Sequence, residues 1–278
     1  MPTSTEMIPL WSGPLPGAVV PGQEQHERAK ETPHLTLFLL EGSAPRPLVV
    51  VLPGGGYSGR AAHEADPVAE WLNGIGMHAV VCHYRVFPWR HPAPLADAQR
   101  AIRLVRHHAA AWQVSLDRIG VLGFSAGGHL ACSVANFGDD GDPASADPVA
   151  REPSRANALI ACYPVVSFGP HGHRGSMINL VGENPDPALH RQLSLENSVT
   201  PRNPPAFLWH SANDPGVPVA NSLLYAQALS DARVPFALHV YPTAPHGIGL
   251  GRNHPGTARE WTRACETWLQ ELWQPSHA

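Results

Sequence analysis

Short, largely apolar runs alternate with amphipathic segments over most of this chain. Such runs are typical of strands that are covered on both faces of a parallel sheet. They predict strands at residues 34–40, 48–52, 78–82, 119–122, 158–162, 206–210 and 236–241. Segments with helical periodicity lie between and after them, at residues 66–73, 94–111, 126–137, 218–232 and 257–272. The alternation predicts an α/β fold with a mostly parallel central sheet and helices on both faces.

The chain shows no internal repeat and no domain boundary, and α/β domains often reach this length, so we expect one domain over residues 1–278. Residues 1–33 are rich in Pro, Gly and polar side chains, which predicts an irregular lead-in. Two long interruptions break the alternation, at residues 138–155 and 167–200. The first has the composition of a mobile loop. The second contains short helical stretches, so we expect it to fold over the site as a small partial lid.

One strand-to-helix turn has a sequence that suggests chemistry. Its residues Gly123-Phe124-Ser125-Ala126-Gly127 follow an apolar strand and precede a helix. This G-x-S-x-G pattern places a serine at the tip of a sharp turn, and the glycines let the two chain segments approach closely. The pattern therefore predicts Ser125 as a nucleophile. A glycine-rich turn without chemistry is the alternative that this motif alone leaves open.

A nucleophilic serine needs a base, and the base needs a third group to orient it. Asp214 directly follows the strand at 206–210, and His246 follows the last strand at 236–241. Both positions lie at carboxyl ends of strands, the sheet edge that also carries Ser125. Asp186 and Asp231 do not follow a strand. Position also distinguishes His246 among the 17 histidines, because a glycine after it lets the chain turn.

Acyl transfer also needs donors for the negative charge that develops on the carbonyl oxygen. Three glycines follow the strand at 48–52, and two of them, Gly55 and Gly56, can offer their backbone N–H groups. Ala126 offers the N–H group after the predicted nucleophile. These three residues are the candidate oxyanion hole. A further set flanks the expected site as candidate substrate contacts: Tyr57, His173 and Ile248.

The composition limits the kinds of partner and substrate that the protein can bind. The net charge is −4 and no block of like charges occurs, which argues against nucleic acid and favours a small neutral substrate. The four cysteines are far apart and no metal-ligand spacing appears, so we expect neither a metal nor another cofactor. No stretch has the length and apolarity of a membrane span. The beginning of the chain lacks a leader pattern, so we expect a cytoplasmic protein, with secretion after removal of a leader left open. A homo-oligomer is also left open.

These motifs resemble the α/β-hydrolase superfamily, and within it the carbohydrate acetyl esterases related to acetylxylan esterases and the bacterial feruloyl esterase-like enzymes. The resemblance covers roughly residues 48–272. Pro53 stands where lipase-like relatives usually carry His, which favours the acetyl esterase branch. The loop at 139–153 departs from the family in length, a departure that concerns the substrate cleft rather than the chemistry. The matching motifs are Leu52-Pro-Gly-Gly-Gly-Tyr57, Tyr84-Arg85, Asp97-Ala-Gln-Arg-Ala-Ile102, Gly123-Phe-Ser-Ala-Gly-Gly-His-Leu130, Ser194-Leu-Glu-Asn197 and Phe207-Leu-Trp-His-Ser-Ala-Asn-Asp214.

The resemblance implies a metal-independent serine esterase that removes acetyl groups from sugar hydroxyls, with xylan fragments as substrate. It implies Ser125 as nucleophile, His246 as base and Asp214 as its orienting acid. Because the base must be neutral, we expect activity to fall as the pH drops through roughly 6 to 7. An arylformamidase or an exopeptidase would use the same three residues. A non-catalytic binding module on a decayed hydrolase fold is the alternative from another class.

Overall fold

The structure, a computed structural model, describes residues 6–273, so the first five and last five residues of the expected domain lie outside the description. One eight-stranded sheet forms the centre, in the order β1-β2-β4-β3-β5-β6-β7-β8. The last six strands in this order run parallel, whereas β1 and β2 pair antiparallel at one edge. The strands are β1 (Met7–Pro9), β2 (His34–Phe38), β3 (Arg46–Leu52), β4 (His78–His83), β5 (Val114–Phe124), β6 (Ala158–Cys162), β7 (Ala206–Ser211) and β8 (Phe236–Tyr241).

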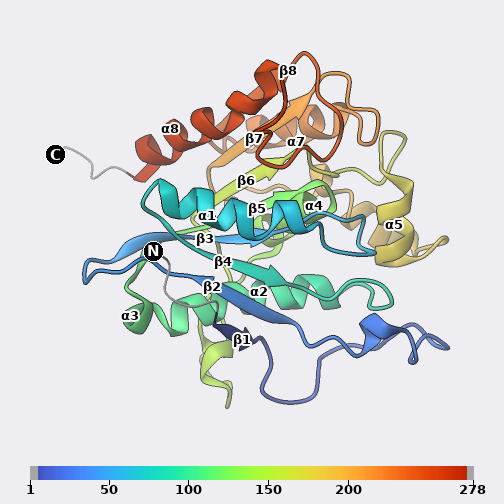
Figure 1. Cartoon of the computed structure of the whole chain (residues 1–278). Coiled ribbons are helices and arrows are strands. Elements are labelled where there is room, and N and C mark those ends of the chain that lie inside the picture. Colours follow the sequence, from blue (N-terminus) through green and yellow to red (C-terminus); the bar gives the residue numbers. More distant parts are fainter. Residues whose placement is uncertain (1–5, 274–278) are drawn as a thin grey trace.

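Helices cover both faces of this sheet (Figure 1). Helices α1 (Asp66–Gly74) and α8 (Trp261–Trp273) pack on one face, where Leu72, Trp261 and Leu269 join a single apolar cluster. The opposite face carries α2 (Ala93–His107), α4 (Ser125–Phe137) and α7 (Ala220–Asp231). The short helices are α3 (Ala109–Trp112), α5 (Arg174–Val181) and α6 (Pro187–Gln192), with 3-10 turns at Glu27–Ala29, Ala62–Glu64, Pro148–Arg151, Leu195–Asn197 and Thr257–Glu260. The predicted fold class is confirmed.

The central strands are apolar on both sides because both sides are covered. Every residue from Leu48 to Leu52 is completely buried, and β6 is buried along its whole length. Full burial of one Val or Leu side chain stabilises a fold by about 1.5–3 kcal/mol relative to exposure. These strands therefore form a rigid base beneath the loops that leave their carboxyl ends. Within residues 6–273, no helix is both long enough and apolar enough to span a bilayer.

The ends of two predicted elements differ from the structure. The lead-in is not wholly irregular, because its residues Met7–Pro9 form β1 against β2. Three residues that end in proline give no alternating pattern from which a strand could be predicted. The helix expected at 94–111 is divided at His108, where α2 ends and α3 begins.

The loop at 138–155 lies at the amino-terminal edge of the sheet, opposite the site. Helix α4 runs back across the sheet, and the loop after it leads to the beginning of β6, where Asn157 donates its backbone N–H to the carbonyl of Ile119, just before β5 begins to pair with β6. The loop is also bound to α2, since Arg103 contacts both carboxylate oxygens of Asp139, at 2.6 and 2.7 Å. Its unusual length therefore does not shape the substrate cleft.

Candidate active site

The turn between β5 and α4 at residues 123–127, which we call the elbow, is strained and tightly packed, and α4 is the elbow helix. Ser125 has a φ of 52°, in the left-handed region that non-glycine residues rarely adopt. A Cβ atom added to Gly123 would lie 2.0 Å from the Gly127 carbonyl oxygen, and one added to Gly127 would lie 2.1 Å from the Leu52 oxygen. Only glycine fits at these two positions. The resulting close approach of helix and strand holds the serine hydroxyl above the edge of the sheet.

The three residues predicted to act together meet at this edge. The Ser125 hydroxyl lies 2.8 Å from His246 Nε2, and His246 Nδ1 lies 2.8 Å from Asp214 Oδ2. Asp214 is buried, and its other oxygen accepts the N–H groups of Gly216 and Val217. Burial alone would raise the pKa of Asp214, but the hydrogen bonds from His246, Val217 and Gly216 hold it below its ordinary value. The carboxylate is therefore ionised at neutral pH and fixes a proton on Nδ1, which leaves Nε2 free to accept one from serine.

A second histidine lies close to the same carboxylate. His210 Nε2 is 3.6 Å from Asp214 Oδ2, but it donates to the Val217 carbonyl at 2.9 Å. Its Nδ1 accepts the Ser222 hydroxyl at 2.8 Å. Burial lowers the pKa of His210 to about 4, so the ring stays neutral beneath the site. This supports the role in the core that its place within a strand suggests.

Two of the three candidate oxyanion donors, Gly55 and Gly56, lie in residues 53–57, which we call the glycine loop, and the third, Ala126, follows Ser125 at the start of α4. Gly55 and Gly56 have φ angles of 135° and 63°, and a Cβ atom on Gly55 would lie 2.4 Å from the Gly59 oxygen. Within residues 6–273, the N–H groups of Gly55, Gly56 and Ala126 have no acceptor. They can therefore donate to a substrate oxygen beside Ser125.

The glycine loop rests on a buried polar scaffold. Tyr84 donates its hydroxyl to the Pro53 carbonyl at 2.6 Å. The adjacent Arg85 forms an ion pair with Asp97 at 2.7 Å, and both side chains are buried. These residues matched the family motifs, and their contacts are those of a support beneath the loop rather than of substrate ligands.

The insertion at 167–200 is held against the glycine loop and the elbow helix. Asn179 on α5 donates its side-chain N–H to the Gly56 carbonyl at 2.9 Å. His129 on α4 donates from Nε2 to the Leu193 carbonyl at 2.9 Å. The insertion thus forms one wall of the site.

The three candidate substrate contacts have different surroundings. The Tyr57 side chain is buried and its hydroxyl lies 2.8 Å from His129 Nδ1, so its ring belongs to the core and not to an open cleft. His173 is half-buried in the insertion, with Nδ1 2.8 Å from the Ser176 hydroxyl. Its pKa is lowered by burial and then by the positive charge that His246 can carry.

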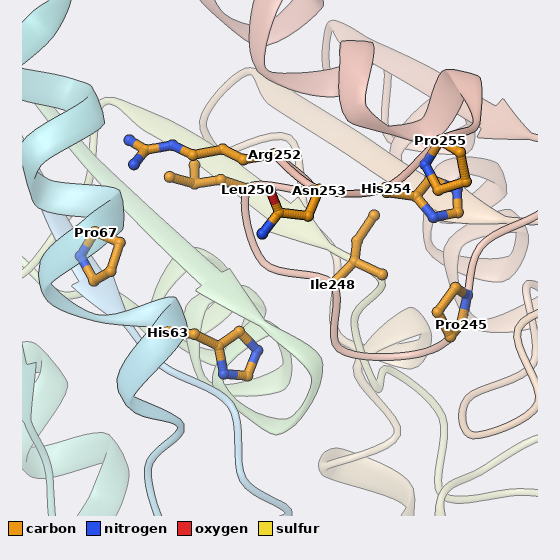
Figure 2. A pocket seen from close by; sticks show the side chains of 10 residues that line it. His63, Pro67, Pro245, Ile248, Leu250, Arg252, Asn253, His254 and Pro255 are labelled. Carbon is orange, nitrogen blue, oxygen red and sulfur yellow. The ribbon is translucent and has the colours of Figure 1, made fainter.

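Ile248 lines a cavity of about 420 Å³ between α1 and the segment at 242–256, which we call the histidine loop. His63 and Pro67 lie on one side of the cavity, and Pro245 and His254 lie on the other (Figure 2). The residues that line it do not include Ser125. Ile248, two residues after the predicted base His246, therefore lines a cavity that the predicted nucleophile does not line.

Two buried residues at the site were not predicted from the sequence. Glu64 lies between the glycine loop and the histidine loop, and Tyr163, directly after β6, joins it there. Neither belongs to a recognised motif. The available indication was positional, because Tyr163 follows a strand at the same edge as Ser125.

The sheet, the elbow and the Ser–His–Asp arrangement define the chain as an α/β-hydrolase. It belongs to the BD-FAE family, whose model matches residues 37–229. Among solved structures, the acetyl ester-xyloside bifunctional hydrolase from Caldicellulosiruptor lactoaceticus aligns with a TM-score of 0.90 and 46% identity, over 96% of each chain.

Two curated relatives are longer proteins. The acetylxylan esterase of Xylanibacter ruminicola is 34% identical over 86% of this chain, and endo-1,4-beta-xylanase B of Butyrivibrio fibrisolvens is 35% identical over 80%. The aligned regions span 46% and 35% of these two proteins.

Groups of three or more His, Cys, Asp or Glu side chains suited to a metal ion are absent from residues 6–273.

Proposed function

We propose that the protein is a serine esterase that removes acetyl groups from carbohydrate hydroxyls, with acetylated xylan fragments as its substrate class. The observation that carries this proposal is the continuous chain of hydrogen bonds from Ser125 through His246 to Asp214, with a distance of 2.8 Å at each step. The backbone N–H groups of Gly55, Gly56 and Ala126 next to the nucleophile support acyl transfer in particular.

The reaction follows from this geometry. As Ser125 Oγ bonds to the ester carbonyl carbon, its proton passes to His246 Nε2, and Asp214 stabilises the imidazolium that forms. The N–H groups of Gly55, Gly56 and Ala126 bind the negative oxygen. The bond to the sugar oxygen then breaks, and His246 returns the proton to that oxygen. Water then gives a proton to His246 as its oxygen bonds to the acetyl carbon; the bond from that carbon to Ser125 Oγ breaks, His246 returns the proton to Oγ, and acetic acid leaves.

The similar proteins support the substrate class, since their names include an acetylxylan esterase and an acetyl ester-xyloside hydrolase. The insertion offers a place for the sugar. A cavity of about 360 Å³ lies within it, lined among others by Phe168, His173, Arg174 and His190. Ring faces combined with hydrogen-bonding side chains suit a sugar, which has both apolar C–H faces and hydroxyls.

Acetate release from acetylated xylo-oligosaccharides tests the proposal. We expect turnover by the native protein and a loss of at least about 10³-fold in the Ser125→Ala variant. N-formylkynurenine and aminoacyl anilides serve as competing substrates. Preference for either would favour an arylformamidase or an exopeptidase on the same fold, and failure to cleave even 4-nitrophenyl acetate would favour a binding module.

A further inference from the structure

Glu64 is a buried carboxylate next to the site that the proposed chemistry does not use. Its side chain is 3% exposed and lies on the 3-10 turn before α1. Burying a carboxylate is costly unless hydrogen bonds compensate for the lost water. Burial accordingly raises the pKa of Glu64, and the bonds from Tyr163 and Gly54 counteract only part of that effect.

One oxygen of this carboxylate holds the glycine loop. Glu64 Oε2 accepts the Gly54 N–H group at 2.8 Å. Gly54 separates the carboxylate from the nucleophile, because a Cβ atom added there would lie 2.6 Å from Glu64 Oε2 and 3.1 Å from Ser125 Cβ. The bond therefore fixes the residue directly before the two glycine donors, at the point where the loop contacts the elbow.

The other oxygen holds the histidine loop through Tyr163. The Tyr163 hydroxyl donates to Glu64 Oε1 at 2.6 Å and accepts the Gly249 N–H group at 2.9 Å. The Tyr163 ring also packs edge-on against the His246 ring, with centroids 5.1 Å apart. The same carboxylate is thus linked to the loop that carries the base.

The residue before Glu64 makes a parallel connection. His63 Nε2 donates to the Gly247 carbonyl at 2.8 Å, directly after His246. This ring stands at the α1 side of the cavity and faces the histidine loop (Figure 2). Its side chain is 57% exposed, so water can replace its bond, whereas the carboxylate of Glu64 is almost completely shielded from water.

We infer that Glu64 is a positioning residue, which sets the distance between the oxyanion donors on the glycine loop and His246 on the histidine loop. It touches neither substrate nor nucleophile and acts through Gly54 and Tyr163. This inference rests on the proposed esterase function. Small displacements of reacting groups cost up to about 10²-fold in rate, so loss of this link affects turnover more than substrate binding.

The test is Glu64→Gln, which keeps the size of the side chain but provides only one acceptor oxygen. We expect kcat for 4-nitrophenyl acetate to fall at least about tenfold, with KM changed less than about threefold. Rates are expressed per serine titrated with a phosphonate ester, so unfolded molecules do not contribute. The matched control is Glu70→Gln on the exposed side of α1, which should retain native kinetics.

Tyr163→Phe removes the hydroxyl at the other end of the same link and provides a second test if Glu64→Gln folds poorly. Because both changes break one connection, the double variant should be little slower than the slower single variant. The inference is overturned if kcat per titrated serine stays within about twofold of native in either folded single variant. Independent, multiplying losses in the double variant would also overturn it.

A measurement without substrate separates this inference from the proposed function. In NMR spectra, Glu64→Gln should shift the imidazole resonances of His246, which Glu64 does not touch, while Glu70→Gln leaves them in place. Unchanged His246 resonances contradict the positioning role. A native protein that cleaves no acetyl ester contradicts the esterase function instead, and the resonances still decide the role of Glu64.

Discussion

Asp214 Oδ2 lies 2.8 Å from His246 Nδ1 and 3.6 Å from His210 Nε2, so one carboxylate oxygen faces two histidines. Only His246 also reaches Ser125. His210 donates to a backbone carbonyl instead and stays neutral. The difference follows from the chain, because His210 lies within β7 and His246 lies on a loop that can turn its ring toward the elbow.

Asp214→Asn should lower kcat by a factor on the order of 10³–10⁴ with little loss of fold. A carboxamide that keeps its oxygen toward Gly216 and Val217 turns its NH₂ group toward His246, which stabilises the wrong tautomer of the ring. Steady-state hydrolysis of 4-nitrophenyl acetate, together with circular dichroism, measures both effects. The matched control is Asp231→Asn at the exposed end of α7. Equal activity of the two variants would exclude Asp214 from the reaction.

Gly123→Ala should destabilise the protein by about 3 kcal/mol or more, or prevent folding. The added methyl group would lie 2.0 Å from backbone atoms of Gly127, and no side-chain rotation relieves a contact with the backbone. Urea denaturation measures the change in the free energy of unfolding. Gly74→Ala on α1 is the control, since a Cβ atom there meets no atom within 4 Å. A Gly123→Ala protein with native stability would show that the elbow is looser than its geometry indicates.

The sequence predicted the parts of this site that depend on strand ends. Ser125, Asp214 and His246 each follow an apolar strand, and parallel strands bring their carboxyl ends to one edge, so the order of the strands along the chain is enough to predict that these residues meet.

Contacts between loops could not be predicted in this way. The pairing of Glu64 with Tyr163 joins residues 99 positions apart and depends on side-chain packing that leaves no periodic pattern. The prediction of Tyr57 as a substrate contact was wrong for the same reason. Its ring points into the core because it packs against His129 and Tyr84, which the sequence alone does not place beside it.

Stability should fall as the pH drops from about 6.5 toward 4. Burial lowers the pKa of both His129 and His210 to about 4, so these rings stay neutral in the folded protein while the unfolded chain takes up protons below about 6.5. The unfolded state then binds more protons, and each ring costs about 1.4 kcal/mol of stability per pH unit within that window. Urea denaturation at pH 7.5 and 5.0 should differ by about 2–4 kcal/mol.

A variant identifies the source of that pH dependence. His129 Nδ1 accepts the Tyr57 hydroxyl and Nε2 donates to Leu193, so a proton on Nδ1 would break the first bond. His129→Gln should be less stable at pH 7.5 but lose less on acidification. His107→Gln, at an exposed position, should keep the native pH dependence. Equal slopes for all three proteins would mean that His129 does not contribute to the pH dependence of stability in this range.

His173→Ala should raise KM for acetylated xylo-oligosaccharides several-fold and leave the hydrolysis of 4-nitrophenyl acetate nearly unchanged. The His173 ring lines the cavity of the insertion, where a bound sugar can contact it, and its Nδ1 lies 2.8 Å from the Ser176 hydroxyl rather than bonding to Ser125 or His246. A small aryl ester does not extend into that cavity, so it should be insensitive to the change. His171→Ala, two residues away with an exposed side chain, controls for loop disturbance. If both substrates are affected equally, His173 supports the catalytic residues rather than the sugar, and the sugar binds elsewhere on the insertion.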